Sequence, residues 1–438
     1  MSPTNRRASE GDQVSTTTMR RAVVAASAGN VVEFYDNIAF GLLAATVGRV
    51  FFPSDVPGVS LLAAFGAFAV TFLARPFGGM LFGSIGDRLG RQRSLVIVIL
   101  LMSCATFGIG LLPGYATIGV AAPAVLLVLR VLQGLSFGGE LGGAASFVAE
   151  YAPPGRRGYT VAWVMLAAFL GNILALGVVT SLSAILSESD MQSWGWRIPF
   201  LIAGPLGGLG LYIRTRLDDT PDFKALRDEG DVSRSPLRRT LLERPRQLLM
   251  TAGLSITVLL TVYIMEAYNT NYLTQTVGIS AADAQAATLV ASVVAMIATV
   301  LFGLASDRFG RKPVLLIASA ATAALAYPVY LVISTGEVID AIAGQSLLGV
   351  LRGALTGVVY IAMLELFPTA VRFTGFALGY GVTAALFGGT APLVATYLVG
   401  VSGNPFAPAY YLIAAAVVTF AVAAMLEETA RTPLREIH

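Results

Sequence analysis

The sequence contains a single histidine, and that histidine is the terminal residue, His438. No histidine can therefore act as a proton relay or a metal ligand within the body of the chain, which excludes the usual zinc and haem sites. The glycine-rich loop that holds the phosphates of ATP is also missing, which argues against ATP hydrolysis. No nucleophile–base constellation appears either, so we expect no enzymatic activity, no metal and no cofactor.

The chain is also poor in cysteine and in charge. Cys104 is the only cysteine, which excludes an intrachain disulfide. Charged residues make up 13% of the sequence, against about 25% in soluble globular domains. Hydrophobic residues make up 55%, and the mean hydropathy is +0.73. This composition excludes a soluble globular protein and indicates a chain surrounded by lipid.

Long apolar stretches are abundant instead. A stretch of roughly 20 apolar residues can cross a bilayer as a helix. Twelve such helices are predicted, near residues 22–48, 58–82, 93–112, 119–151, 159–186, 196–215, 247–277, 283–305, 313–334, 338–367, 371–400 and 406–426.

The basic residues predict the orientation of these helices. If the N-terminus is cytoplasmic, all but five of the 29 basic residues fall in cytoplasmic loops and tails. Arg49 and Arg197 fall outside, and Arg75, Arg130 and Arg352 fall within helices. This is the distribution of a multi-pass protein of the cell membrane with both termini in the cytoplasm. The net charge of +3 then reflects the loops, and we expect no nucleic-acid partner.

One charged motif occurs twice, half a chain length apart. The first copy reads GSIGDRLGRQR at Gly83–Arg93, and the second reads GLASDRFGRK at Gly303–Lys312. Each copy lies between two apolar stretches, which indicates two homologous halves of six helices each. Two such bundles that rock about a central site are the plan of a secondary transporter. We therefore predict an all-α membrane protein with twelve transmembrane helices in two pseudo-symmetric six-helix bundles.

The predicted division of the chain has five parts. They are a cytoplasmic tail (1–21), an N-terminal bundle (22–215), a cytoplasmic linker (216–246), a C-terminal bundle (247–426) and a second cytoplasmic tail (427–438). The linker is acidic first and basic later, and both a short interfacial helix with basic residues towards the lipid headgroups and a solvated linker fit this pattern.

Several segments carry a family resemblance. The doubled motif resembles the signature of the major facilitator superfamily. SAGNVVEFYD at 27–36, FLARPFGG at 72–79, LQGLSFGGE at 132–140, FVAEYAPPGRRG at 147–158, WGWRIPF at 194–200 and LDDTPDF at 217–223 are similar to the metabolite:proton symporter family within it. The proline/betaine-transporting members have the most similar sequence motifs. The family also includes transporters of shikimate and other organic acids. The chain departs from the family pattern at Asn37 and Glu266. We also expect no osmotic gating through a long coiled-coil tail of the kind that osmosensory members of the family carry.

Acidic residues within the predicted helices are the candidate proton carriers. An ionised group at mid-membrane costs about 2.5–3.5 kcal/mol on insertion scales, so such groups usually have a functional reason. Glu33 and Asp36 lie on one face of the first helix, and two carboxylates so close cannot both ionise at low cost. We interpret this pair as the leading proton-coupling site, with Glu140 and Glu266 as the next candidates. The alternative is that Glu33 and Asp36 permanently neutralise Arg75 or Arg130.

Two arginines are the candidate partners of a substrate carboxylate. Arg130 and Arg352 both lie early in the fourth helix of their repeat, and a guanidinium matches a carboxylate in shape and charge. Pairing of each arginine with an acid of the protein remains the alternative, and we expect Arg75 to have a structural role. The full predicted substrate site comprises Arg130, Gln133, Trp163, Tyr263, Tyr268, Asn269, Arg352 and Tyr360.

The seventh helix is unusually polar around Tyr263–Tyr272. Lipid-facing backbone and side chains could not satisfy so many polar groups, so we expect this stretch to line the cavity and to be locally unwound. The alternative for Tyr268 is a position at the membrane interface.

The doubled motif is the predicted gate. The resemblance implies that Asp87 and Arg91 pair with Glu150, and that the second copy repeats this arrangement. Such charge clusters can hold one conformation and release it when the bundles rock. The full predicted gate comprises Gly83, Asp87, Arg88, Arg91, Glu150, Asp307, Arg308, Arg311 and Glu365.

The function predicted from these observations is proton-coupled import of a small carboxylated or zwitterionic metabolite by alternating access. Candidates are osmolytes of the proline/betaine type and organic acids, and a surplus of acids over arginines in the helices favours a zwitterion. An exporter or antiporter and a non-transporting membrane receptor are the alternatives. The expected partners are the small-molecule substrate, protons and membrane lipids, and the expected state is a monomer.

Overall fold

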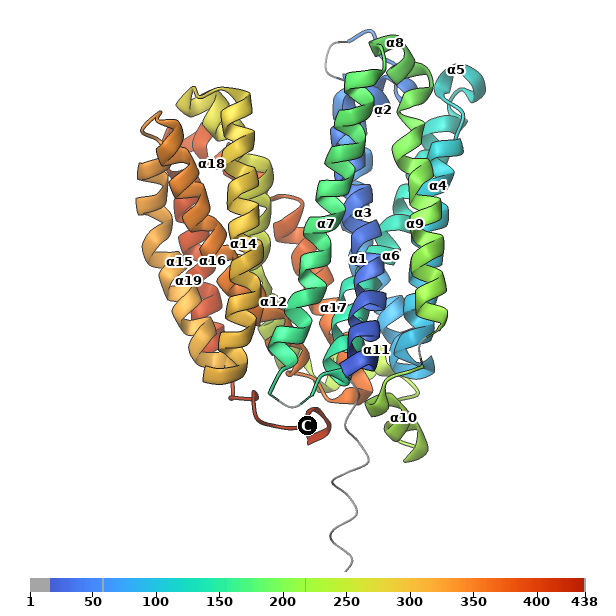
Figure 1. The fold of residues 1–438 in the computed structure, drawn as a ribbon, viewed down its shortest axis with the longest axis vertical. Helices are drawn as coiled ribbons and strands as arrows, with labels where there is room; N and C mark the ends of the chain where they lie inside the picture. Colours follow the sequence, from blue (N-terminus) through green and yellow to red (C-terminus); the bar gives the residue numbers. More distant parts are fainter. Residues whose placement is uncertain (1–15, 57–58, 154, 217, 437–438) are drawn as a thin grey trace, which may run out of the picture.

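The structure is a computed structural model that describes residues 16–56, 59–153, 155–216 and 218–436 of the chain. Every regular element within these ranges is a helix. The helices form two bundles that stand side by side and meet at one end (Figure 1).

The N-terminal bundle contains the first six spans and the short helices that connect them. Its elements are α1 (Thr16–Leu42), α2 (Ala44–Phe51), α3 (Val59–Leu89), α4 (Arg91–Leu111), α5 (Tyr115–Ile118), α6 (Ala121–Tyr151), α7 (Arg157–Ile185), α8 (Glu188–Asp190), η1 (Met191–Gly195) and α9 (Arg197–Thr215).

The C-terminal bundle repeats this plan. Its elements are α12 (Pro245–Tyr263), η2 (Ile264–Tyr268), α13 (Asn269–Tyr272), η3 (Leu273–Val277), α14 (Ala281–Phe309), α15 (Arg311–Ile333), α16 (Val338–Leu364), η4 (Thr369–Val371), α17 (Arg372–Thr383), η5 (Ala384–Gly388), α18 (Ala391–Ser402), α19 (Ala407–Ala424) and η6 (Leu434–Glu436). The linker adds α10 (Pro221–Asp228) and α11 (Pro236–Glu243).

The prediction of twelve spans is confirmed, with one change in the first. Eleven of the described helices are long and apolar enough to cross a membrane, and the bent pair α1–α2 brings the number to twelve. The prediction of one continuous helix over residues 22–48 was wrong, because the chain turns by 70° between α1 and α2. The short helix α2 buries Ala44, Val47 and Phe51 on one face. Phe51 packs edge-on against Trp196, with ring centroids 5.4 Å apart, so the bend lets α2 cover the end of the bundle.

The seventh span is helical throughout, although the sequence suggested unwound backbone there. It runs from α12 through η2, α13 and η3, and the two η segments are π-helical. The eleventh span contains a similar π-helical segment, η5, between α17 and α18. Such wide turns shift the side chains around the helix axis and are frequent at functional sites.

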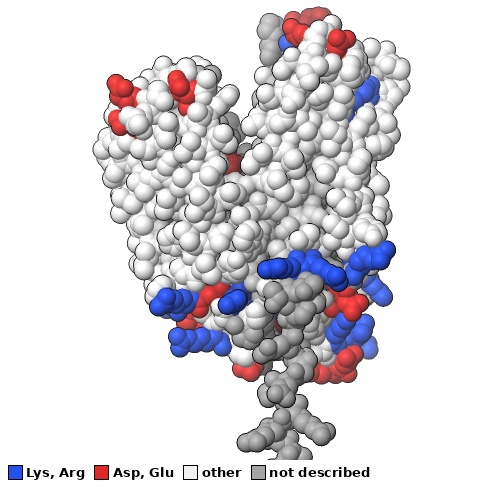
Figure 2. Space-filling model, in the orientation of Figure 1, with Lys and Arg blue, Asp and Glu red and all other residues white. Residues whose placement is uncertain are grey.

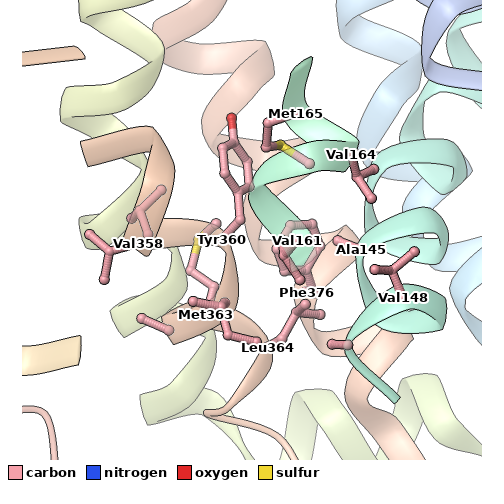
Figure 3. Packing of buried hydrophobic residues seen from close by; sticks show 14 of the residues in the cluster. Ala145, Val148, Val161, Val164, Met165, Val358, Tyr360, Met363, Leu364 and Phe376 are labelled. Atoms are coloured by element: carbon pink, nitrogen blue, oxygen red, sulfur yellow. The ribbon is translucent and has the colours of Figure 1, made fainter. Parts of the chain in front are cut away.

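One apolar cluster joins the two bundles at the end where they meet. The N-terminal bundle contributes α6 and α7 residues such as Val148 and Met165, and the C-terminal bundle contributes Val358, Leu364 and Phe376 (Figure 3). Burial of apolar surface from both halves holds this end closed. Below, we call this cluster the apolar plug.

The opposite end of the molecule is open. Figure 2 shows the surface hollowed between the two lobes at that end, whereas the lysines and arginines gather at the closed end. The linker helices α10 and α11 lie at the closed end too (Figure 1). Between the open cleft and the apolar plug, the two bundles face each other across the middle of the molecule.

Candidate substrate and proton site

The two acidic residues of α1 have different surroundings. Asp36 is fully buried within the N-terminal bundle. Its Oδ2 lies 3.1 Å from an Arg130 guanidinium nitrogen, and its Oδ1 accepts a hydrogen bond of 2.7 Å from the Gln133 amide. The guanidinium of Arg130 also donates to Gln133 and stacks over the ring of Phe40, 4.0 Å from its centroid. Arg130 and Gln133 therefore pair with an acid of the protein, the alternative that the sequence left open.

Glu33 is held much more loosely. Its carboxylate lies 3.5 Å from a guanidinium nitrogen of Arg75, on α3, the longest separation among the buried ion pairs of the described chain. Charge-assisted hydrogen bonds are usually 2.7–2.9 Å long. The second carboxylate oxygen of Glu33 and the Nε of Arg75 are buried without a hydrogen-bond partner among the described residues. This pair is therefore free to exchange partners at little cost.

Arg75 lies where the two bundles meet. Phe72 and Phe137 of the N-terminal bundle flank its guanidinium at 4.5 and 5.4 Å. On the other side it interacts with Tyr263 and Tyr380 of the C-terminal bundle. The sequence suggested a structural role for this arginine. It gave no indication that Arg75 lies between the two halves.

A second acid–base pair belongs to the C-terminal bundle. Arg352 of α16 donates a hydrogen bond of 2.6 Å to Glu266, which lies in the π-helical segment η2. The guanidinium also lies 4.9 Å from the ring centroid of Phe169 on α7, so it reaches across to the N-terminal bundle. Arg352 and Glu266, predicted separately as substrate and proton sites, form one ion pair.

The other predicted substrate residues divide into two groups. Tyr360 and Tyr263 lie near Arg352 and Glu33 between the bundles. Asn269 instead hydrogen-bonds Gln345 and the Tyr330 hydroxyl, at 3.2 and 2.7 Å, inside the C-terminal bundle.

The two remaining aromatic residues of that prediction pack against other tyrosines. Tyr268 stacks on Tyr272, with ring centroids 6.1 Å apart. Trp163 is 43% exposed and packs edge-on against Tyr159.

Glu140, another predicted proton carrier, has a partner that sequence reasoning missed. Arg214, at the end of α9, forms two hydrogen bonds to its carboxylate, one from each terminal nitrogen. The same guanidinium donates to the carbonyl oxygens of Ala25 and Leu95. A buried carboxylate held by a bidentate arginine is well compensated, so Glu140 is the most firmly paired of the four candidates.

The doubled motif lies at the closed end and connects the halves. Asp87, on α3, accepts hydrogen bonds from the backbone amides of Phe373 and Thr374 at the start of α17. Gly83 lies one turn earlier, where an added Cβ would come within 2.7 Å of the Thr374 Cα. The N-terminus of a helix carries a partial positive charge, so Asp87 ties the N-terminal bundle to a helix of the other half.

The second copy makes the reciprocal contact. Asp307, on α14, accepts hydrogen bonds of 2.8 Å each from the amides of Gly158 and Tyr159, at the start of α7. The two aspartates therefore cap helices across the bundle interface in opposite directions. The glycines that close the two turns, Gly90 and Gly310, have φ values of 111° and 105°, which glycine adopts more readily than any other residue.

A glutamate of each half connects two arginines from different halves. Glu150 lies 3.3 Å from Arg91 and 3.0 Å from Arg372 of the other bundle. These three residues bring the N-terminal copy of the motif into contact with the first turn of α17.

Glu365 makes the equivalent contacts in the C-terminal half. It lies 3.1 Å from Arg311 and 2.7 Å from Arg157 of the other bundle. Of the nine predicted gate residues, Arg88 and Arg308 are exposed, and neither forms an ion pair within the described ranges.

Two acids outside the helices complete this arrangement, and sequence reasoning missed both. Asp219 accepts hydrogen bonds from the amides of Arg91 and Gln92 at the start of α4. Burial raises the pKa of the Asp219 carboxyl and outweighs these hydrogen bonds.

Glu428 does the same for the C-terminal half, at the start of α15, where it accepts from the amides of Arg311 and Lys312. Burial favours the neutral form of Glu428, but these amides and that of Ala430 hold the pKa of its carboxyl below the ordinary value. The sequence does contain a signal for this pair of acids. Residues 217–220 read LDDT and residues 426–429 read LEET, so a similar acidic segment follows each bundle.

Comparison with known proteins gives a consistent result. The family described as "Sugar (and other) transporter" matches residues 22–244 and again residues 237–438. The chain is 39% identical to the proline/betaine transporter of Escherichia coli (strain K12) over 427 residues, which cover 95% of this chain and 85% of that protein. It is 38% identical to the glycine betaine/proline/ectoine/pipecolic acid transporter OusA of Dickeya dadantii (strain 3937), with the same coverage.

Solved structures agree on the fold. The proton:xylose symporter XylE of the major facilitator superfamily, bound to 6-bromo-6-deoxy-D-glucose, superposes with a TM-score of 0.78 over 96% of this chain and 98% of that chain, at 17% identity. The predicted fold is therefore confirmed. The protein has the fold of the major facilitator superfamily. It belongs to the sugar (and other) transporter family and is a multi-pass membrane transporter.

Proposed function

We propose that the protein is a proton-coupled symporter that imports a small zwitterionic osmolyte of the proline/betaine type by alternating access. The observation that carries the proposal is the loosely held Glu33–Arg75 pair, whose arginine interacts with Tyr263 and Tyr380 of the other bundle. The names of the relatives at 38–39% identity support the substrate type. The proposal places the chain as a monomer in the cytoplasmic membrane, among lipids and with both termini in the cytoplasm.

Glu33 is the proposed proton carrier. Asp36 accepts hydrogen bonds from both Arg130 and Gln133, Glu140 is held by two hydrogen bonds from Arg214, and Glu266 pairs with Arg352 at 2.6 Å. Glu33 alone combines burial, a long ion pair and an oxygen without a partner. An ionised carboxylate in such a place is costly, and accepting a proton relieves that cost.

The doubled motif is the proposed gate. If the basic, closed end faces the cytoplasm, the structure corresponds to an outward-open state. The cross-bundle contacts of Asp87, Asp307, Glu150 and Glu365 must then break before the substrate can leave towards the cytoplasm. Interfaces of this kind switch between two discrete packings, as alternating access requires.

Proton movement with substrate tests this function. Purified protein is reconstituted into liposomes that contain a pH-sensitive dye, and glycine betaine or proline is added outside. We expect the lumen to become more acidic when substrate is added, and we expect no such change with protein-free liposomes. Uptake without acidification, or acidification of opposite sign, would contradict symport and favour uniport or antiport.

A further inference from the structure

Three tyrosines of the C-terminal bundle converge next to Arg75. Tyr360 is on α16 and Tyr380 on α17, and their ring centroids are 5.8 Å apart. Tyr263, at the end of α12, packs edge-on against Phe72, with 5.7 Å between centroids. These three rings, which we call the tyrosine cage, interact with one another, with Arg75 or with Glu33.

The cage lies between the apolar plug and the open cleft. Tyr360 is part of the plug cluster, and Tyr380 packs against it. Figure 3 shows the ring of Tyr360 next to Met165, with its hydroxyl directed away from Leu364 and Met363. Tyr263 and Tyr380 are only partly buried. The rings of Tyr263 and Tyr380 are therefore the parts of the cage that a solute between the bundles can reach, next to Arg75.

Arg75 differs from the other arginines of the two bundles' interiors. Arg130 is paired with Asp36 and is fully buried, Arg214 is bidentate on Glu140, and Arg352 is hydrogen-bonded to Glu266. Among the described residues, the only carboxylate that contacts Arg75 is that of Glu33, at 3.5 Å, and its other neighbours are the aromatic residues named above. Its Nε has no hydrogen-bond partner there. It is therefore the guanidinium that can accept a new carboxylate without leaving a tightly bound one unpaired.

We propose that Arg75 binds the carboxylate of the substrate and that the tyrosine cage binds an alkylated, positively charged ammonium group beside it. The inference rests on the proposed function and assigns the residues that select the substrate. The face of an aromatic ring attracts a cation, and an ammonium nitrogen covered with alkyl groups needs such faces because it has few or no hydrogens to donate. The preferred ligand is a compact zwitterion whose two charges are separated by one carbon atom.

The charges around the cage agree with this class of ligand. Arg352 and Glu266 neutralise each other, so Arg75 and Glu33 are the groups whose charge the substrate must match. A dicarboxylate would place a second negative charge against the ring faces and near Glu33, which is unfavourable. A cation without a carboxylate would leave Arg75 unmatched.

The same exchange links the substrate to the proton. The charged groups that face Glu33 are Arg75 from α3, Glu140 from α6 and Asp36 from α1 itself, and the titratable tyrosines Tyr263 of α12 and Tyr360 of α16 face it from the other bundle. When a substrate carboxylate takes the place of Glu33 at Arg75, Glu33 loses its only cation and keeps two acidic neighbours. Protonation of Glu33 by a proton from the cleft then becomes more favourable, so proton and substrate promote each other's binding.

A pair of isosteres tests the cage. Glycine betaine and 3,3-dimethylbutanoate have the same shape, but only the first carries a positive charge. We expect purified wild-type protein to bind glycine betaine at least tenfold more tightly. Tyr380→Leu should reduce this ratio about tenfold, whereas Tyr380→Phe, which keeps the ring, should change it less than threefold. Tyr397→Leu, at a 65% exposed tyrosine of α18, is the matched control.

The ratio of the two affinities is measured on the same preparation, so partial misfolding of a variant does not alter it. An unchanged affinity ratio in both Tyr380→Leu and Tyr263→Leu would overturn the proposal that the tyrosine cage binds the ammonium group.

A second pair of ligands tests Arg75. Choline carries the same trimethylammonium group as glycine betaine but has a hydroxyl in place of the carboxylate. Arg75→Gln should lose most of the preference for glycine betaine over choline, and Arg75→Lys should keep part of it. If Arg130→Gln lost that preference and Arg75→Gln kept it, the assignment would be overturned.

These binding measurements separate the inference from the proposed function. Failure of the wild-type protein to bind any zwitterion would refute the substrate class itself, and the cage with it. Zwitterion binding with the expected ratios, but without proton movement in liposomes, would support the cage and contradict symport.

Discussion

At the scale of single residues, the main finding is how differently the buried acids are held. The sequence placed Glu33 and Asp36 on one face of a helix, which the structure bears out, but it could not say which arginine each acid meets. The pairing depends on how α1 packs against α3 and α6. These helices bring together residues that are far apart in the sequence. Asp36 and Arg130 form a hydrogen-bonded network with Gln133 inside one bundle, whereas Arg75, the partner of Glu33, faces the other bundle.

The Asp36–Arg130 pair should therefore contribute mainly to stability. Asp36→Asn leaves a buried guanidinium without its counter-charge, and we expect a loss of about 3–5 kcal/mol in stability. Arg130→Met should cost a similar amount. The double variant should be more stable than the sum of the two single losses predicts, because it leaves no unpaired charge. Thermal unfolding in detergent checks this, and strictly additive losses would contradict a closed pair.

At the scale of helices, the twelve spans and the two halves were predictable because each rests on a local signal. Apolar runs predict spans, and the repeated glycine–aspartate–arginine motif predicts the turns at Gly90 and Gly310. The bend after α1 and the π-helical segments were not predicted, since both result from packing against neighbouring helices. Arg214 was counted as a loop charge, because nothing in the sequence shows that it turns back into the bundle towards Glu140.

The cross-bundle caps of α17 and α7 make a prediction about the gate. Asp87→Asn replaces a charge at the N-terminus of α17 with a neutral amide, which weakens the closed end without touching Arg75 or the tyrosines. We expect substrate affinity to change less than threefold, while the population shifts towards closure of the open end. Spin labels at Ser189 and Thr335, one in each half at the open end, should move closer together.

Asp307→Asn should act in the same direction, because it weakens the reciprocal cap. Asp55→Asn, at an exposed acid near the open end, is the control and should leave the distance unchanged. An unaltered distance in both cap variants would contradict the gate assignment.

The cap at the start of α15 predicts a pH effect. The pKa of Glu428 is lowered on folding, so its ionised form stabilises the protein at neutral pH. This contribution is lost as the pH falls from about 4.5, the ordinary value, through the lower value of the folded state. Glu428→Gln should therefore melt at a lower temperature than wild type at pH 7, and the difference should shrink on acidification. Glu427→Gln, at an exposed neighbour, should show neither effect.

At the scale of the two bundles together, the direction of transport depends on which end of the molecule faces the cytoplasm. The basic residues gather at the closed end (Figure 2), which fits the positive-inside rule if that end is cytoplasmic. In a Cys104→Ala background, a cysteine at Ser235 in the linker should react only after the cells are opened. A cysteine at Ser402, the last residue of α18, should react from outside. Labelling of the Ser235 cysteine in intact cells would contradict this orientation and would place the linker outside the cell.

The central claim is that Glu33 couples substrate movement to protons, and the accumulation ratio tests it most directly. A proton that crosses 100 mV gains about 2.3 kcal/mol, which supports roughly a fortyfold gradient of a neutral zwitterion. In liposomes with that potential imposed, inside negative and without a pH gradient, wild-type protein should approach this accumulation of glycine betaine. Glu33→Gln should exchange labelled for unlabelled substrate but should reach no more than equal concentrations on both sides. Accumulation by Glu33→Gln as high as that of the wild type would contradict the account.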